Sequence, residues 1–316
     1  MSLRRACIAS AICALAVSIA AGCSATGDAS GVGASLGAGG GASSSSATSS
    51  SSTGTSGVGG SPLMLTGSDA GTDASADGST ADCPASAKLI YVTGSSNQLY
   101  SYDPTTGVFT LIGTFDCLTN PTHMTVDRSG TAWVVSNGLL YTASTVNAHC
   151  NLVSNWTPGV NEFFDFALTF VGTGPGTDPN LYVLDDSGNL AAFNPTTGVR
   201  TAITTLAGLT SSLGDMTSNG DGHLYFVHDV AAQRLYEIVP TTGAVVNSWL
   251  TTEVGGNSEA LAFYGGLFYD FLGSAAYTFD TSTSTAQSVG NAPLEVTGAG
   301  QSTCVPMTAP PPAMLQ

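Results

Sequence analysis

Short runs of alternating apolar and polar residues fill the chain from Lys88 to Cys304. Runs such as 123–127 and 131–135 are rich in Val, Thr and large apolar residues, which is typical of β-strands. Gly, Asn, Asp and Pro separate the runs at the spacing of tight turns. No part of this region has a sustained helical periodicity, so the pattern predicts an all-β domain.

One strand–turn–strand unit recurs along this domain. It is clearest at 99–113, 190–203 and 235–249, where an apolar strand leads into the turn Pro-Thr-Thr-Gly, and weaker copies begin at Leu140 and Ala276. The corresponding turn positions are 40, 51, 45 and 41 residues apart, at Pro104, Ser144, Pro195, Pro240 and Thr281. A period of roughly 40–50 residues with several strands per unit predicts the blades of a β-propeller.

The repeats predict five four-stranded blades, at about residues 88–117, 121–156, 161–207, 212–252 and 257–290. The first blade begins directly with its second strand, and a spare strand at 294–300 follows the last blade. Pairing of these two segments would close the ring and remove the exposed edges of an open sheet. We therefore expect a five-bladed β-propeller closed by a C-terminal strand that completes the first blade.

Two segments outside the propeller have compositions that do not favour a packed core. Residues 23–82 are almost entirely Gly, Ala, Ser, Thr and Asp, and residues 307–316 are rich in proline. Such sequences bury too little apolar surface to offset the entropy of ordering them. We expect a disordered tether at 23–82, the propeller at 83–306 and a disordered tail at 307–316.

The chain begins with the features of an export signal. Arg4 and Arg5 precede an apolar run too short to span a bilayer, so residues 1–22 are predicted to be a signal peptide. The sequence Ile19-Ala-Ala-Gly-Cys23 resembles the bacterial lipobox, and the Ser/Gly-rich segment after it is similar to the tethers of bacterial surface lipoproteins. The resemblance implies diacylglycerol on Cys23, cleavage before it and acylation of its amine. We expect these acyl chains to anchor the protein in the outer membrane or at the cell surface.

Removal of the signal would leave a strongly acidic chain. Four Lys and Arg residues remain against 22 Asp and Glu, which is a net charge of 4 − 22 = −18. Nucleic-acid binding needs a basic surface, which this composition excludes. An anionic membrane surface would repel the chain, so attachment would depend on the lipid. We expect a monomer whose acidity keeps it soluble.

Four cysteines remain besides Cys23 after removal of the signal, and four cysteines permit three pairings. Cys83 and Cys304 flank the first and last blades, where the ring must close. Cys117 and Cys150 lie in neighbouring repeats, at an inter-blade loop and an outer strand. Propeller geometry therefore predicts the disulfides Cys83–Cys304 and Cys117–Cys150. No Cys-x-x-Cys motif or His/Cys cluster indicates a zinc or redox site.

Alignment of the inner strands places one titratable residue per blade at the same level: His123, Asp165, Asp215, Glu259 and Glu295. Inner strands line the central channel of a propeller, so we expect these side chains to form a ring at its mouth. Converging carboxylates repel one another unless a proton or a cation lies between them. Their oxygens suit Ca²⁺, and the imidazole would also accept a transition ion. Alternatively, the acids cap loop amides at the starts of the strands.

The Val-Asp-x-x-Gly and Leu-Tyr-x-x-Asp patterns of 88–304 resemble those of NHL, WD-type and senescence-marker/gluconolactonase propellers. The resemblance covers the blade pattern and implies the fold. Gluconolactonase-like propellers bind a divalent metal in this region through a Glu, an Asn and an Asp, but their Pro-Glu-Gly context is absent from this sequence. The remaining histidines, at His149, His223 and His228, have no mutual spacing that demands a metal and are expected to be ordinary polar residues.

Three functions fit this sequence. We expect a surface-tethered propeller that binds a ligand or partner with its channel face and has no catalytic role. A metal-dependent hydrolase or lactonase that uses the acidic ring is the alternative, and a purely structural envelope propeller is the third. A metal enzyme would need ring oxygens within about 2.3–2.6 Å of a common point for Ca²⁺.

Overall fold

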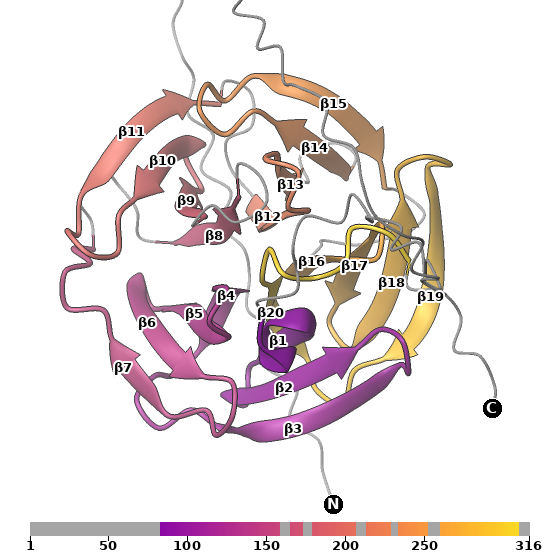
Figure 1. The fold of residues 1–316 in the computed structure, drawn as a ribbon, viewed down its shortest axis with the longest axis horizontal. Helices are drawn as coiled ribbons and strands as arrows, with labels where there is room; N and C mark the ends of the chain where they lie inside the picture. The colour runs from indigo at the N-terminus through magenta and orange to yellow at the C-terminus, as the bar shows by residue number, and fades with distance from the viewer. Residues whose placement is uncertain are drawn as a thin grey trace, which may run out of the picture. The chain divides into compact units, whose positions relative to one another are not determined.

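The computed structural model describes residues 83–158, 165–172, 179–206, 213–228, 233–251 and 260–309. The expected signal peptide and tether, with Cys23, lie outside the described residues, as do Glu259 and the end of the tail from residue 310. In the described part, the strands form five antiparallel four-stranded sheets around a common axis (Figure 1). This arrangement confirms the predicted five-bladed β-propeller.

Each blade runs from an inner strand beside the axis to an outer strand at the rim. In this order, blade 1 contains β20 (Val296–Gln301), β1 (Ile90–Gly94), β2 (Gln98–Asp103) and β3 (Val108–Thr114). Blade 2 contains β4 (Pro121–Val126), β5 (Thr131–Ser136), β6 (Leu139–Ser144) and β7 (Cys150–Leu152). Blade 3 contains β8 (Phe166–Val171), β9 (Asn180–Asp185), β10 (Asn189–Phe193) and β11 (Arg200–Thr205). Blade 4 contains β12 (Leu213–Ser218), β13 (Leu224–His228), β14 (Arg234–Ile238) and β15 (Val245–Leu250). Blade 5 contains β16 (Ala260–Tyr264), β17 (Leu267–Leu272), β18 (Ala275–Asp280) and β19 (Thr285–Asn291).

The ring closes in blade 1, as the sequence predicts. β20 pairs antiparallel with β1 in a register that runs from Ile90↔Gln301 to Gly94↔Val296. Glycine then lets β20 approach the next inner strand closely. A Cβ on Gly300 would collide with the carbonyl oxygen of Met124 in β4. The first and last strands of the propeller therefore pair beside β4 at a position where only glycine fits.

The repeated turn between the third and fourth strands has one backbone shape in strong and weak copies. In the strong copy at 103–107, the Gly107 amide donates to the Asp103 carbonyl at 2.8 Å, and Gly107 has a φ of +69°. In a weak copy, the Ala148 amide donates to the Ser144 carbonyl at 2.9 Å with a φ of +60°. The left-handed conformation is unfavourable for a residue with a Cβ. The structure of the blade therefore holds the turn in this conformation even where the turn has no glycine.

Within the described residues, five hydrophobic clusters each lie between two adjacent blades, and a small sixth cluster joins Cys83, Ala87 and Cys304. For example, Phe166 and Leu168 of blade 3 pack with Val135 and Trp156 of blade 2. The second strands are buried along their length because neighbouring blades cover both of their faces, as in β13. The outer strands are exposed, as β15 shows. Burial therefore stabilises the contacts between blades and leaves the rim to solvent.

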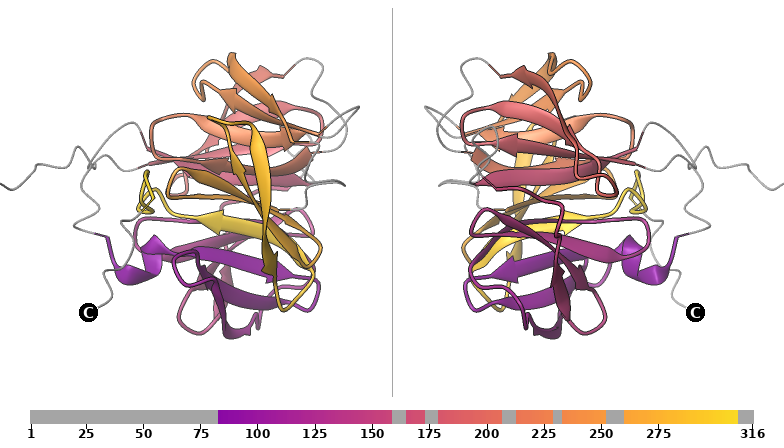
Figure 2. Two further views of the ribbon diagram at one scale, coloured as in Figure 1. Left: turned by 90° about the vertical axis from the view of Figure 1, so that its right-hand side faces the viewer. Right: turned by 90° about the vertical axis from the view of Figure 1, so that its left-hand side faces the viewer.

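The two faces of the ring differ in what they carry. β1 runs antiparallel to β20, so the start of the propeller and the end of its last strand meet at one face. This face, named the Cys83 face, holds the short 3₁₀ helix η2 (Ala85–Lys88) and the disulfide Cys83–Cys304, and Figure 2 shows η2 projecting from it. The opposite face, named the Asp165 face, is where the inner strands begin. No helix in the described residues is long and apolar enough to cross a membrane.

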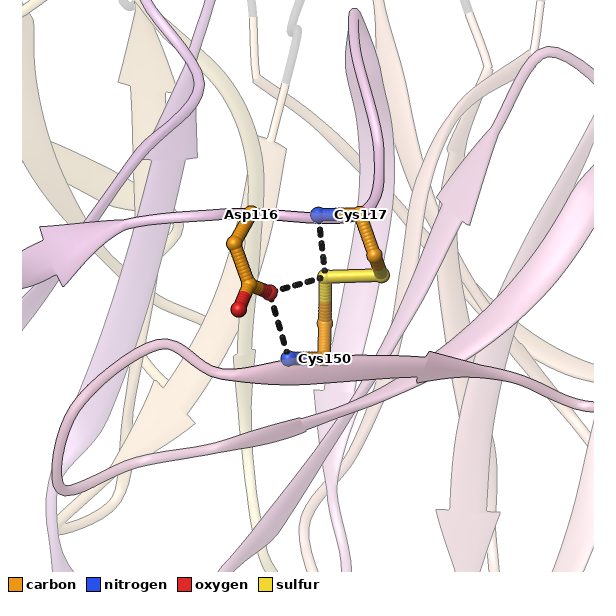
Figure 3. Close-up of side chains that lie close together, drawn as sticks. All are labelled: Asp116, Cys117 and Cys150. Atoms are coloured by element: carbon orange, nitrogen blue, oxygen red, sulfur yellow. Dashed lines mark hydrogen bonds between the residues drawn. A yellow bond between two sulfur atoms is a disulfide. The ribbon is translucent and has the colours of Figure 1, made fainter.

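Both predicted disulfides are present. Cys83–Cys304 joins residues 221 positions apart, and Cys117–Cys150 joins residues 33 positions apart. Figure 3 shows that the second bridge links the loop between blades 1 and 2 to β7, next to Asp116. The Asp116 carboxylate accepts a hydrogen bond from the Cys150 amide at 3.0 Å. Because both sulfurs are bonded to each other, this group has no thiolate to offer a metal.

We predict that the long-range bridge stabilises the fold more than the short-range bridge. In the chain-entropy model, a loop of 221 residues corresponds to about 5 kcal/mol and a loop of 33 residues to about 4 kcal/mol. Denaturant unfolding of the C83A/C304A and C117A/C150A variants measures both losses. An equal or larger loss of unfolding free energy in C117A/C150A would contradict the prediction.

Candidate functional site

The centre of the propeller is organised around the buried carboxylate of Asp215. A register shift in β12 between Leu213 and Met216 marks a bulge at this residue, and such bulges redirect side chains. Asp215 Oδ2 accepts hydrogen bonds from the amides of Leu261 at 3.1 Å and Ala299 at 3.3 Å. Its Oδ1 accepts one from its neighbouring Met216 amide at 2.9 Å. One side chain of blade 4 therefore bonds the inner strands of blades 5 and 1.

His123 connects the same carboxylate to blade 2. Its Nδ1 lies 3.1 Å from Asp215 Oδ1, and its Nε2 lies 3.8 Å from Asp165 Oδ1. Burial by itself lowers the pKa of His123, but the hydrogen bond to Asp215 and the charges of Asp215 and Asp165 raise it above the ordinary value. The imidazolium form of His123 is therefore more favoured in the folded protein than in the unfolded chain.

A second polar layer lies two residues further along the inner strands. Gln301 of β20 accepts the Phe263 amide at 3.1 Å, and its Nε2 donates to the Ser218 carbonyl at 2.6 Å and to Thr217 Oγ1 at 2.7 Å. All of these contacts are buried. Side chains on one face of a strand recur every two residues. The second layer therefore joins the same blades, 1, 4 and 5, as the Asp215 carboxylate does in the first layer. Both layers satisfy backbone groups on the free edges of inner strands.

The members of the predicted ring have different environments. The structure brings together His123, Asp215 and Asp165, but Asp215 is fully buried while the Asp165 side chain is 61% exposed. Asp165 also accepts a hydrogen bond from Thr122 Oγ1 at 3.3 Å. Glu295 directly precedes β20 and is exposed, and Glu259 lies outside the described residues. The ring is therefore divided into a buried pair and exposed acids at the Asp165 face.

A different group of potential ligands was not predicted from the sequence. Asp221, His223 and Glu237 each offer a ligand atom, and these atoms lie within 4.8 Å of one another. The sequence contains an Asp-x-His pattern at 221–223, but Glu237 is distant along the chain. Cross-strand pairing of Tyr225 with Glu237 brings them together. The pattern could have been noticed only if the register of β13 and β14 had been known.

We predict that His123 contributes stability that is present at acidic pH and disappears as the pH rises. Its folded-state pKa is raised above the ordinary value of about 6.5. The contribution should be complete below about pH 6.5 and lost as the pH rises through the folded-state pKa. Unfolding free energies of wild type and H123Q between pH 5 and 9 test this. H149Q removes an exposed histidine as the control, and a pH-independent difference between wild type and H123Q would contradict the prediction.

Comparisons with known proteins give similarity of shape without a family. No protein-family model matches the chain, and no curated protein sequence matches it. A solved structure of the nidogen/laminin complex has 16% identity and a TM-score of 0.45, over 68% of this chain and 80% of that chain. Virginiamycin B lyase from Staphylococcus aureus has 11% identity and a TM-score of 0.40, over 64% and 70% of the two chains. The Dos1 propeller has 10% identity and a TM-score of 0.40, over 67% and 69%.

Proposed function

We propose that this chain is a lipid-tethered binding module whose ligand contacts the Asp165 face of the propeller. The observation that carries the proposal is the difference in burial among the polar groups at the centre. Asp215 and Gln301 are buried and bonded to neighbouring strands, whereas Asp165 and Glu295 are exposed. Groups that already bond the fold together contribute to stability, and exposed carboxylates are accessible to a ligand.

The binding role is favoured over hydrolysis because the oxygens of the buried Asp215 carboxylate are already engaged in contacts within the fold. Both Asp215 oxygens accept backbone amides, and Oδ1 also faces His123. A catalytic carboxylate or metal ligand would need a lone pair directed at the substrate or ion. Asp215 therefore fits a positioning role within the fold.

The ligand that fits the Asp165 face is cationic, such as a basic peptide, an organic amine or Ca²⁺. Neither Asp165 nor Glu295 pairs with a Lys or Arg within the described ranges. The whole chain has 22 acidic and six basic residues, which would attract cations over a long range.

The proposed tether would leave this face accessible. It would join the propeller at Cys83, on the face opposite Asp165. A flexible segment of roughly 60 residues has a root-mean-square length of about 40 Å. A lipid on Cys23 would thus hold the monomeric propeller near the outer membrane or cell surface while leaving the Asp165 face free for a ligand.

We predict that Cys23 is required for membrane attachment. In a Gram-negative host, wild type should partition with the membrane fraction and carry acyl groups on its N-terminal peptide by mass spectrometry. The C23A variant should be soluble, because the propeller is expected to lack another membrane-binding element. C13A, which alters a cysteine of the expected signal peptide, is the control and should stay attached. Equal membrane attachment of C23A would exclude the lipid anchor.

We predict that charge removal at the Asp165 face weakens cation binding. A lysine-rich peptide should bind wild type more tightly than D165N/E295Q by about twofold to thirtyfold, since each of the two exposed charge pairs contributes about 0.2–1 kcal/mol. Isothermal titration at low salt, with Ca²⁺ and a glutamate-rich peptide as further probes, gives the affinities. D103N/D280N removes two acids from hairpin turns and is the matched control. Equal loss of affinity in both double variants would contradict a specific site.

A further inference from the structure

The strongest unassigned cluster lies in blade 4, near the turn between β12 and β13. His223 Nδ1 lies 2.7 Å from Glu237 Oε1 and 3.7 Å from Asp221 Oδ1. Asp221 and His223 belong to the turn, and Glu237 lies near the end of β14, which returns to the same edge of the blade. The three groups therefore converge from two segments on the Cys83 face, away from the Asp165 face.

Each carboxylate of the cluster has one oxygen held by an asparagine amide. Asn219 Nδ2 donates to Asp221 Oδ2 at 2.8 Å, and Asn247 Nδ2 donates to Glu237 Oε2 at 2.6 Å. The other oxygen of each carboxylate faces His223, and Asp221 Oδ1 also accepts one hydrogen bond, from the His223 amide at 2.9 Å, which leaves it a second lone pair. In metal sites, such hydrogen bonds to the oxygen that does not face the metal orient the carboxylate.

The imidazole does not complete a hydrogen bond with these oxygens. His223 Nδ1 is shielded from solvent and has no partner that meets hydrogen-bond geometry, although Glu237 Oε1 is only 2.7 Å away. The distance is that of an ion pair, but the alignment is not that of an N–H donor. Hydrogen bonds weaken steeply at poor angles, so the short distance does not make this contact a hydrogen bond. A buried nitrogen thus faces carboxylate oxygens without a well-aligned proton.

The cluster also concentrates negative charge. The Glu237 side chain is only 9% exposed, and the ion pair recorded for it within the described residues is with His223. The Tyr225 hydroxyl also lies 3.5 Å from Asp221 Oδ2. Two carboxylates in this setting favour a bound cation.

We propose that Asp221, His223 and Glu237 bind a divalent transition-metal ion, with Zn²⁺ as the ion whose ligand preferences fit best. Zn²⁺ accepts imidazole nitrogen and carboxylate oxygen together, whereas Ca²⁺ and Mg²⁺ prefer oxygen alone. Three protein ligands leave a fourth position for water, and Asp221 and His223 are both about one-third exposed, which gives an ion access.

The ion would fasten the turn to the body of the blade. Gly220, next to Asp221, lies against Met307, since a Cβ there would be 3.2 Å from the Met307 sulfur. The segment after Cys304 also bonds to blade 5, where the Gly265 amide donates to the Pro306 carbonyl at 2.8 Å. Metal binding would therefore stabilise the Cys83 face, where the last residues of the domain cross blades 4 and 5.

Zinc binding to the full mature chain tests the proposal. We expect one Zn²⁺ per chain by equilibrium dialysis, a Zn²⁺-dependent rise in melting temperature, and visible absorption on substitution with Co²⁺. H223Q and E237Q should lose all three. N247A changes an exposed residue that holds the ligand Glu237, so it should retain the fold and bind Zn²⁺ about tenfold or more weakly.

H149Q is the matched control, because His149 also pairs with a carboxylate, Asp116, while the other ligand atoms grouped with Asp116 in the described part of the chain are the two sulfurs of a disulfide. It should bind Zn²⁺ like wild type. Absence of Zn²⁺ binding in folded wild type would overturn the proposal, and so would equal binding by wild type, H223Q and N247A. A site that prefers Ca²⁺ over Zn²⁺ would overturn the choice of metal.

Discussion

The bonding of the inner-strand edges at the centre is the constraint on which the propeller depends. An inner strand pairs with its neighbour along one edge, and its other edge faces the axis without a partner strand. Buried backbone groups left without partners are costly. The Asp215 carboxylate meets this need for the Leu261 and Ala299 amides, and His123 supplies the opposing charge. Blades 1, 2, 4 and 5 are thus joined by side chains where no sheet continues.

The closure of the ring and the polar contacts at its centre both depend on β20. β20 completes blade 1 and also supplies the Ala299 amide and the Gln301 side chain to the centre. The absence of side chains at Gly298 and Gly300 allows β20 to lie against β4. Loss of β20 would therefore open blade 1 and remove partners from both polar layers, and the disulfide at Cys304 anchors the segment that directly follows this strand.

The proposed ligand-binding site and the proposed metal site lie on opposite faces of the propeller. The Asp165 face has exposed acids around a buried, internally bonded centre, which suits ligand contact without catalysis. The Cys83 face has the first described residue of the chain and a compact set of nitrogen and oxygen ligands at Asp221, His223 and Glu237. Binding and metal-dependent stabilisation would therefore take place at opposite ends of the ring.

The sequence alone could predict the features that neighbouring residues encode. The recurring turns, the strand alternation and the orphan strand at 294–300 were enough for five blades and closure, and the blade order then selected both disulfides. The inner-strand alignment also placed His123, Asp165 and Asp215 at one level, and these three do meet. It could not show that Asp215 is buried and Asp165 exposed, because the β12 bulge and contacts from three other blades decide that. Nor could it join His223 to Glu237, whose contact depends on cross-strand register. Turns and strands are encoded by neighbouring residues, whereas burial and charge pairing depend on residues that only the closed ring brings together.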